Sequence, residues 1–264
     1  MLVIGERINA TRRRIARAMA DRDADLVARE ARVQAEAGAD FIDVNAGSDP
    51  TREADNLKWA VEVLQRSTDL PLCLDSSNPD VLRQGLELID GGVVMLNSVT
   101  AEEDKLAQVL PLAAESGALL VALAMDDRGL PDSAERRVEI TAKLVDAAGQ
   151  AGITSDRLYV DPCIQPISTG GEHGTAVVSA VFRIMRAFEG VHTTCGLSNI
   201  SFGLPNRNLI NRIYVACLIM AGLDSAICDP TAEGLMDSVR AAEALAGRDE
   251  FCMNYIRAMR DAGR

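Results

Sequence analysis

Residues 158–163, LYVDPC, place an aspartate directly after three apolar residues. The apolar residues indicate a buried strand, and a carboxylate at its end lowers stability unless another group binds it. Comparable apolar runs occur seven more times along the chain. They are LVIGERIN (2–9), FIDVNAG (41–47), LPLCLDSS (70–77), VVMLNSV (93–99), LLVALAMDD (119–127), TTCGLSN (193–199) and SAICDP (225–230). The chain therefore repeats one unit, a short buried strand that ends in a polar residue.

The segments between these runs are amphipathic and carry helix-start and helix-stop signals. Those signals are Asp49-Pro50, Thr100 with Gly117 after its segment, Asp132 or Ser133, and Pro205-Asn206. Runs that are apolar on both faces are typical of parallel strands covered by helices. Strand and helix alternating eight times over about 250 residues predict a (β/α)8 TIM barrel, here one domain spanning residues 1–264. The rival, an open doubly wound sheet, would carry a G-x-G-x-x-G fingerprint after a strand, and none occurs.

Charge and hydropathy narrow the classes of partner. The formal net charge of -12 disfavours binding to phosphate backbones, so we expect no nucleic-acid partner. The N-terminal residues MLVIGERIN turn polar after four residues, and no apolar run has the length of a membrane span. We therefore expect a cytoplasmic protein without a membrane partner. An anionic ligand would need a local cation on so acidic a chain.

The sequence lacks the residues that three kinds of TIM-barrel enzyme or site require. A Schiff-base aldolase needs a lysine at a strand end, but Lys58, Lys105 and Lys143 all lie in helical segments. A metal-dependent hydrolase needs several histidines there; His173 lies in the loop STGGEHGT and His192 precedes the seventh strand. The six cysteines form no C-x-x-C pair and read as reduced residues, most of them in the core, so no metal is predicted. The glycine-rich loop at 170–171 follows the sixth strand, not the seventh or eighth, and is either a mobile cover or a flexible connection.

A polar residue closes every predicted strand. The set comprises Glu6, Asn9, Asp43, Asn45, Asp75, Asn97, Asp126, Asp161, Asn199 and Asp229. Because the carboxyl ends of barrel strands converge on one face, these residues predict a site, although Asp126 and Asp229 also fit simple helix caps. Carboxylates and carboxamides suit a ligand with a row of N–H donors and ring acceptors, such as a pterin. A few hydrogen bonds of about 1.5–3 kcal/mol each would give micromolar binding.

Several motifs then resemble one enzyme family, in order and with matched spacing from residue 3 to about residue 230. They are GERIN (5–9), DVN (43–45), LCLDSSN (72–78), LNS (96–98), YVDP (159–162) and GLSNISFGLPNRNLINR (196–212). Together they are similar to the methyltetrahydrofolate:corrinoid methyltransferases and to the folate module of cobalamin-dependent methionine synthase. That family has a pterin-binding (β/α)8 barrel, in agreement with the fold predicted from the strand pattern.

The resemblance implies a role for each matched residue. Asp75, Asn97 and Asp161 would hold the pterin, with Asn199 beside N5 and Arg207 at the glutamate tail. Ser198, Asp43 and Asn45 would complete the substrate-binding set, and Phe202 stands where some relatives have a polar residue. No general acid is evident near the ring, so we expect Asn199 to donate a hydrogen bond to N5 while the proton comes from solvent.

The implied reaction moves a methyl group between N5 of tetrahydrofolate, as 5-methyltetrahydrofolate, and the cobalt of a corrinoid such as cobalamin. A D-x-H-x-x-G corrinoid motif is missing, so the corrinoid would come on a partner protein or free. The resemblance also implies a homodimer. The direction of transfer stays open, as do two alternatives. A dihydropteroate synthase-like enzyme would carry a lysine after the seventh strand, whereas a non-catalytic folate-binding protein would bind without transfer.

Overall fold

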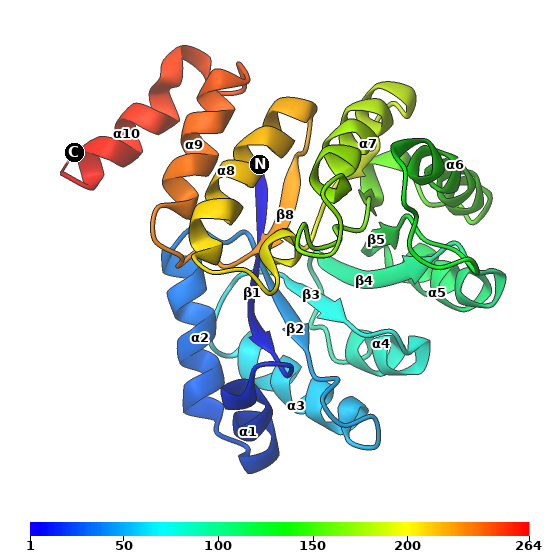
Figure 1. Ribbon diagram of the computed structural model, residues 1–264. Coiled ribbons are helices and arrows are strands. Elements are labelled where there is room, and N and C mark those ends of the chain that lie inside the picture. The colour runs from blue at the N-terminus through cyan, green and yellow to red at the C-terminus, as the bar shows by residue number, and fades with distance from the viewer. Residues whose placement is uncertain (264) are drawn as a thin grey trace.

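Eight parallel strands form the centre of the computed structural model, which describes residues 1–263. The strands are β1 (Leu2–Asn9), β2 (Phe41–Asn45), β3 (Leu72–Asp75), β4 (Val94–Thr100), β5 (Leu119–Leu123), β6 (Leu158–Asp161), β7 (His192–Thr193) and β8 (Ser225–Cys228). Their order in the sheet is β7-β6-β5-β4-β3-β2-β1-β8, with every pair parallel. Consecutive strands are thus neighbours, and the last strand returns to the first (Figure 1). The predicted (β/α)8 barrel is confirmed.

The barrel closes between β7 and β8 through contacts at a short seam. Ile227 N donates to Cys195 O at 2.9 Å, and Ser225 Oγ donates to Thr193 O at 3.1 Å. Gly196 and Ile227 form a parallel bridge just beyond the end of β7. The seam is needed because β7 has only two residues and cannot form a full ladder with β8.

Helices surround the strands on the outside (Figure 1). They are α1 (Arg13–Asp21), α2 (Ala24–Glu36), α3 (Glu53–Gln65), α4 (Pro79–Leu86), α5 (Glu103–Ser116), α6 (Ala134–Gln150), α7 (His173–Ala187), α8 (Arg207–Ala221), α9 (Leu235–Leu245) and α10 (Met253–Asp261). Short 3-10 turns are η1 (Ser155–Arg157), η2 (Leu197–Ser201) and η3 (Glu250–Cys252). None of the helices in the described residues is long and apolar enough to cross a bilayer.

Helix boundaries follow the predicted signals in part. Ser133 caps α6 by accepting a hydrogen bond from Arg136 N, and Gly117 ends α5 in the left-handed conformation, as the sequence predicts. The expected start at Asp49-Pro50 is wrong, because those residues form a turn and α3 begins at Glu53. Thr100 likewise belongs to β4 and does not start a helix.

The inside of the barrel is filled by a cluster of apolar side chains. This interior cluster consists of Ile4, Phe41, Cys73, Met95, Val121 and Tyr159. A second, larger set of apolar residues lies between the sheet and the helices. The apolar side chains therefore fill the barrel beneath the carboxyl ends of the strands. Polar residues stand at those ends.

Both histidines differ from their predicted places. His192 belongs to β7 and does not precede it; its Nδ1 lies 2.6 Å from Asp224 Oδ2, and its ring stacks on Tyr159 with centroids 4.7 Å apart. His173 is the first residue of α7 and not part of the preceding loop, with Nδ1 2.9 Å from Pro166 O. Each histidine thus has a structural contact of its own.

Candidate functional site

The polar residues at the strand ends point into the barrel for a simple geometric reason. Side chains alternate along a strand, so a residue two positions after an inward-facing one also faces inward. Two positions after members of the interior cluster stand Glu6, Asp43, Asp75, Asn97 and Asp161. The structure therefore places these five on the same side of the interior cluster, as a polar lining at the mouth of the barrel.

Neighbouring strands β2, β3 and β4 hold part of this lining in one network. Asn45, Asp75 and Asn97 are partners in the strand register. Asn45 Nδ2 donates to Asp75 Oδ2 at 3.0 Å, and Asn97 Nδ2 donates to Asp43 Oδ1 at 3.3 Å. The two carboxamides are thus oriented. The Asn97 Oδ1 atom accepts no hydrogen bond from residues 1–263 and can accept one from a ligand.

Burial makes the carboxyl groups of this network unusual. The pKa of Asp75 is raised to about 6, first by burial and also by the charge of Glu53, against the lowering effect of the Asn45 hydrogen bond. Burial and the nearby charge of Asp75 raise the pKa of Asp43 as well. Perturbed carboxyls gathered in a barrel mouth make this part of the barrel a candidate functional site.

Asp161 on β6 is held mainly by backbone groups. Its Oδ1 accepts from Cys163 N at 2.7 Å, and the N–H of Gly196 also bonds to its carboxyl group. Burial nevertheless raises the pKa of Asp161 to about 6, because these N–H groups and the charge of Arg137 offset only part of the desolvation. The carboxylate is therefore fixed in direction, and a ligand with N–H donors would complete its partners.

The residue that supports this strand end was not predicted. Arg137 on α6 is fully buried and donates from Nε to Pro162 O at 2.6 Å and from Nη2 to Cys163 O at 3.3 Å. It thereby holds the turn that immediately follows Asp161. The signal was present in the sequence, because Arg137 shares the helical spacing of the buried residues Ile140, Thr141 and Leu144.

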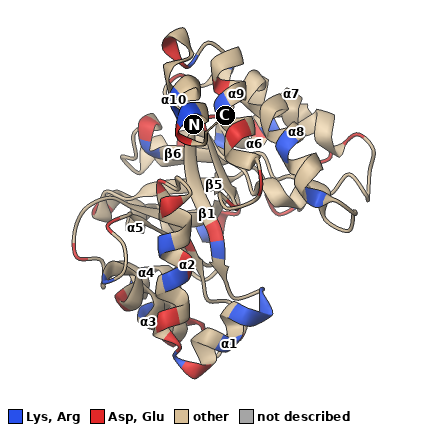
Figure 2. Ribbon diagram, turned by 90° about the vertical axis from the view of Figure 1, so that its left-hand side faces the viewer, with Lys and Arg blue, Asp and Glu red and all other residues tan. Residues whose placement is uncertain are grey.

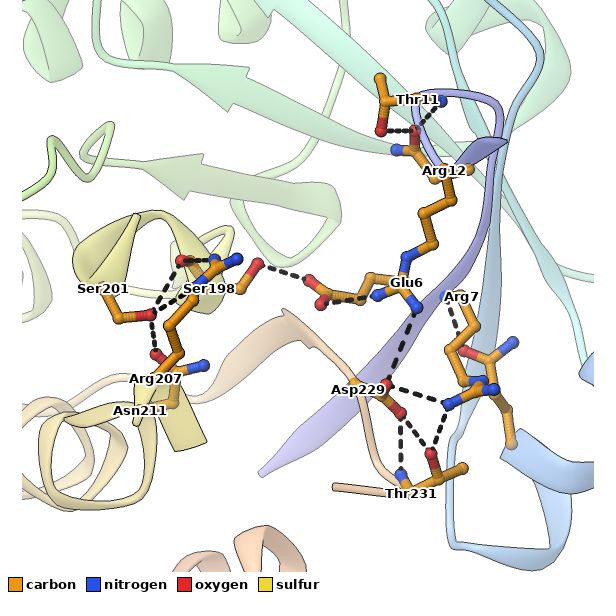
Figure 3. A network of polar contacts seen from close by, with 12 residues as sticks. Glu6, Arg7, Thr11, Arg12, Ser198, Ser201, Arg207, Asn211, Asp229 and Thr231 are labelled. Atoms are coloured by element: carbon orange, nitrogen blue, oxygen red, sulfur yellow. Dashed lines mark hydrogen bonds and ion pairs between the residues drawn. The ribbon is translucent and has the colours of Figure 1, made fainter. Parts of the chain in front are cut away.

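A second group of contacts crosses the mouth from β1 to η2 (Figure 3). Ser198 Oγ donates to Glu6 Oε2 at 3.0 Å, while Arg12 Nη2 lies 3.3 Å from Glu6 Oε1. Arg207, the first residue of α8, donates to Ser198 O at 2.6 Å and to Ser201 Oγ at 3.1 Å. Burial raises the pKa of Glu6, and the charges of Arg12 and Arg207 partly counter that effect. Cations therefore stand on this side of the mouth, opposite the carboxyl network.

Two strand-end aspartates have structural partners, but the helix-cap reading is wrong, because the residue before α6 is Ser133 and the residue before α9 is Gly234. Asp229 accepts from Thr231 N at 3.0 Å and from Arg7 Nη1 at 3.1 Å (Figure 3). Asp126 lies beyond the end of β5, accepts from Arg128 N at 3.1 Å and pairs with Arg136. In both cases, these bonds stabilise the turn that follows the strand.

Asn199 differs from its predicted place at a strand end. β7 ends at Thr193, and Asn199 lies in η2, where its side chain is exposed. Its carboxamide has no hydrogen-bond partner among residues 1–263, so it is free to meet a ligand. Phe202 is the first residue after η2; its ring is exposed, and the Arg207 guanidinium lies 5.9 Å from the ring centroid.

The loop that carries Gly170-Gly171 is attached to the same turn. Ile167 N donates to Ile200 O at 3.1 Å, and Ser168 Oγ donates to Phe202 O at 2.9 Å. The loop therefore borders η2, and the two readings of it, a cover and a connection, both remain compatible with this position.

The predicted site residues thus fall into two groups around one mouth. Carboxyl and carboxamide groups from β2, β3, β4 and β6 form the carboxyl side, and the turn η2 with Arg207 and Arg12 forms the other. The two sides meet at Asp161, which bonds to the N–H of Gly196 just before η2. An elongated ligand with N–H donors at one end and carboxylates at the other matches this distribution of charge.

Comparison with known proteins agrees with this geometry. A family of pterin-binding enzymes matches residues 5–229. The methylcorrinoid:tetrahydrofolate methyltransferase of Eubacterium limosum is 36% identical over 263 residues, 98% of this chain and 96% of that protein. Methionine synthase of Mycobacterium tuberculosis is 35% identical over 240 residues, which are 86% of this chain but 20% of that enzyme.

Solved structures match the fold at low sequence identity. Dihydropteroate synthase from Vibrio fischeri ES114 superposes with a TM-score of 0.71 at 18% identity, covering 94% of this chain and 93% of that one. The Coxiella burnetii dihydropteroate synthase in complex with pteroic acid gives a TM-score of 0.67 at 14% identity, covering 93% of each chain. These likenesses concern the fold alone. The sequence match over residues 5–229 goes further: the chain belongs to the family of pterin-binding enzymes.

Proposed function

We propose that the chain is a single-domain methyltransferase that moves a methyl group between N5 of tetrahydrofolate and the cobalt of a corrinoid. One observation carries the proposal: the polar mouth occurs in a chain that is similar over 98% of its length to a methylcorrinoid:tetrahydrofolate methyltransferase. Tetrahydrofolate and the corrinoid are the two substrates in this account.

In the proposed complex, the pterin end of folate enters the carboxyl side of the mouth. Asp75 and Asp161 accept from pterin N–H groups, and Asn97 Oδ1 accepts beside them. Asp43 and Asn45 orient Asn97 and Asp75 through the bonds already described. The opposite end of folate then reaches η2, with Ser198 beside the benzoyl group and Arg207 at the glutamate carboxylates.

Asn199 is the proposed catalytic residue. Its free, exposed carboxamide stands on η2 at the rim, where it can donate to N5 of the bound folate. The N5–methyl bond breaks as the cobalt–carbon bond forms, and N5 takes a proton from solvent. A donor that bonds N5 more strongly as its basicity develops lowers the barrier and not only the Kd.

The partner of the enzyme is a corrinoid, carried by a separate protein or free in solution. It must approach the carboxyl ends of the strands, because N5 would lie there. We further propose a cytoplasmic location. All six cysteines are free, and thiols persist in a reducing compartment.

A homodimer is proposed from the surface of α7 and α8. Both helices are mostly free of charged residues in Figure 2. Phe182, Ile213 and Met220 are about half exposed on them, and a cavity of about 710 Å³ lies between the two helices. A second copy covering this face would remove that apolar surface from water.

Dihydropteroate synthase activity is the alternative that the fold supports. Lys58, Lys105 and Lys143 lie on α3, α5 and α6, on the outside of the barrel, so none stands beside η2 where that family is expected to carry one. The other alternative is a non-catalytic protein that binds folate without transferring the methyl group.

The reverse reaction tests all three functions. The purified protein is mixed anaerobically with methylcobalamin and tetrahydrofolate, and 5-methyltetrahydrofolate is measured by chromatography. The proposal predicts product in proportion to enzyme. A parallel mixture of 6-hydroxymethyl-dihydropterin pyrophosphate and p-aminobenzoate should give no dihydropteroate. Dihydropteroate without methyl transfer would establish the first alternative, and saturable folate binding without either product would establish the second.

A further inference from the structure

A basic segment stands beside the mouth of this acidic chain. Residues 11–20, TRRRIARAMA, contain four arginines and no acidic residue, although the whole chain has a net charge of -12. The four residues, Arg12, Arg13, Arg14 and Arg17, are all exposed and are called the arginine strip below. Blue segments gather at the start of α1 in Figure 2.

Contacts connect Arg12 of the arginine strip to Arg207, the residue proposed to bind the glutamate tail of folate. Arg12 lies 3.3 Å from Glu6, Glu6 accepts from Ser198 at 3.0 Å, and Arg207 donates to Ser198 O (Figure 3). Arg12 and Arg207 are therefore on either side of one glutamate at the rim. The remaining arginines continue outward along α1 from Arg12.

Much of the donor capacity of the arginine strip is unused within the chain. Arg13 has no ion-pair partner among residues 1–263. The Arg14 side chain is 63% exposed and approaches the largely buried Glu30 at 3.5 Å, whereas Arg17 and Asp21 form a pair in which both side chains are mostly exposed. An exposed pair such as Arg17–Asp21 is weak and exchanges readily for another carboxylate. Cations near the start of a helix also oppose its dipole, so these arginines add little to the stability of α1.

We propose that the arginine strip binds the additional γ-linked glutamates of a polyglutamylated tetrahydrofolate. The inference rests on the proposed function, which directs the first glutamate to Arg207. Each further glutamate adds one carboxylate, and the negative charge of the rest of the chain repels such a tail. The strip supplies guanidinium groups in a row that begins at the rim, and guanidinium pairs well with carboxylates.

The test compares two ligands and two double variants. Kd is measured for 5-methyltetrahydrofolate with one and with five glutamates, at low and high salt. The double variant R13S/R14S removes two arginines of the strip. R257S/R260S removes two exposed arginines from α10, at the other end of the molecule (Figure 1), and is the matched control.

The wild type should bind the pentaglutamate about five- to tenfold more tightly at low salt, since each exposed pair contributes a factor of about two to five. High salt should reduce this ratio. R13S/R14S should lower the ratio of the two Kd values to about two or less, because Arg12 and Arg17 remain, and R257S/R260S should keep it.

Two results would overturn the inference. Equal Kd values for both ligands in the wild type would show that the tail is not bound, while the proposed function would stand. An unchanged ratio in R13S/R14S would place the tail elsewhere. If the Kd values are equal, slower transfer from a corrinoid protein in R13S/R14S would assign the strip to an acidic protein. Failure of the monoglutamate to bind would instead contradict the proposed function.

Discussion

Asn45 donates a hydrogen bond from Nδ2 to Oδ2 of Asp75 at 3.0 Å, so a carboxamide on β2 fixes a carboxylate on β3. The register of the two strands places these residues directly side by side. Asp75 therefore faces the mouth in a defined orientation before any ligand enters. Such preorganisation reduces the ordering cost of binding.

Asp75→Asn should weaken folate binding and leave the fold intact. The amide keeps the shape of the side chain but loses the charge that strengthens the bonds from pterin N–H groups. We expect Kd for 5-methyltetrahydrofolate to rise about ten- to a hundredfold, in line with the loss of hydrogen bonds to a charged group. Titration calorimetry measures it, with D80N on the exposed surface of α4 as the control. An unchanged Kd would remove Asp75 from the site.

Asp161 should make the stability of the ligand-free protein depend on pH. Its pKa in the folded protein is about 6, above the ordinary value of 3.8, because it is buried. The folded state therefore binds the proton more tightly, and this contribution is present at low pH and lost as the pH rises through 6. The free energy of unfolding of the wild type relative to D161N should fall by up to about 3 kcal/mol between pH 4 and pH 7. Urea denaturation at both values measures this difference.

Ionisation of Asp161 lowers the stability of the ligand-free protein but should increase its affinity for folate. The ionised carboxylate is the stronger acceptor, so Kd should fall as the pH rises through 6. If wild type and D161N showed the same pH dependence in both measurements, Asp161 would not be the group that titrates.

Asn199→Ala should affect turnover far more than binding. A donor that acts in the transition state contributes a factor of about 10²–10³ in kcat, whereas the ground-state Kd should change little. Stopped-flow kinetics at saturating folate measure kcat, and N254A on the exposed surface of α10 provides the control. Intact turnover with a weakened Kd would show that Asn199 is only a binding residue.

Arg207→Ala should distinguish the two ends of the ligand. Arg207 is expected at the glutamate carboxylates, so Kd for 5-methyltetrahydrofolate should rise about tenfold or more. Kd for a tetrahydropterin without the benzoyl-glutamate tail should stay the same. An equal loss for both ligands would indicate that Arg207 acts through its bonds to Ser198 and Ser201, by holding η2 in place.

The sequence alone predicts the barrel and the carboxyl side of the site. Asp75 and Asp161 follow short apolar runs, and the two-residue alternation of a strand fixes the direction of their side chains. Asn199 was expected at a strand end because TTCGLSN continues the same apolar pattern. Only His192 and Thr193 pair in the sheet, however, and the chain turns before Asn199.

The other side of the mouth depends on contacts between distant segments. The bond between Glu6 and Ser198 joins residues 192 positions apart, and no local pattern indicates it. Arg137 is different, because its helical spacing places it on the buried face of α6. A buried arginine could therefore be predicted, but its carbonyl partners after Asp161 could not.

The most direct test of methyl transfer is the forward reaction with free substrates. The protein is mixed anaerobically with 5-methyltetrahydrofolate and cob(I)alamin, and the Co(I) absorption is followed over time. We expect an enzyme-dependent loss of that absorption with formation of methylcobalamin, and a much slower loss with N199A. A Co(I) absorption that stays constant with the wild type, under conditions where folate is bound, would contradict the account.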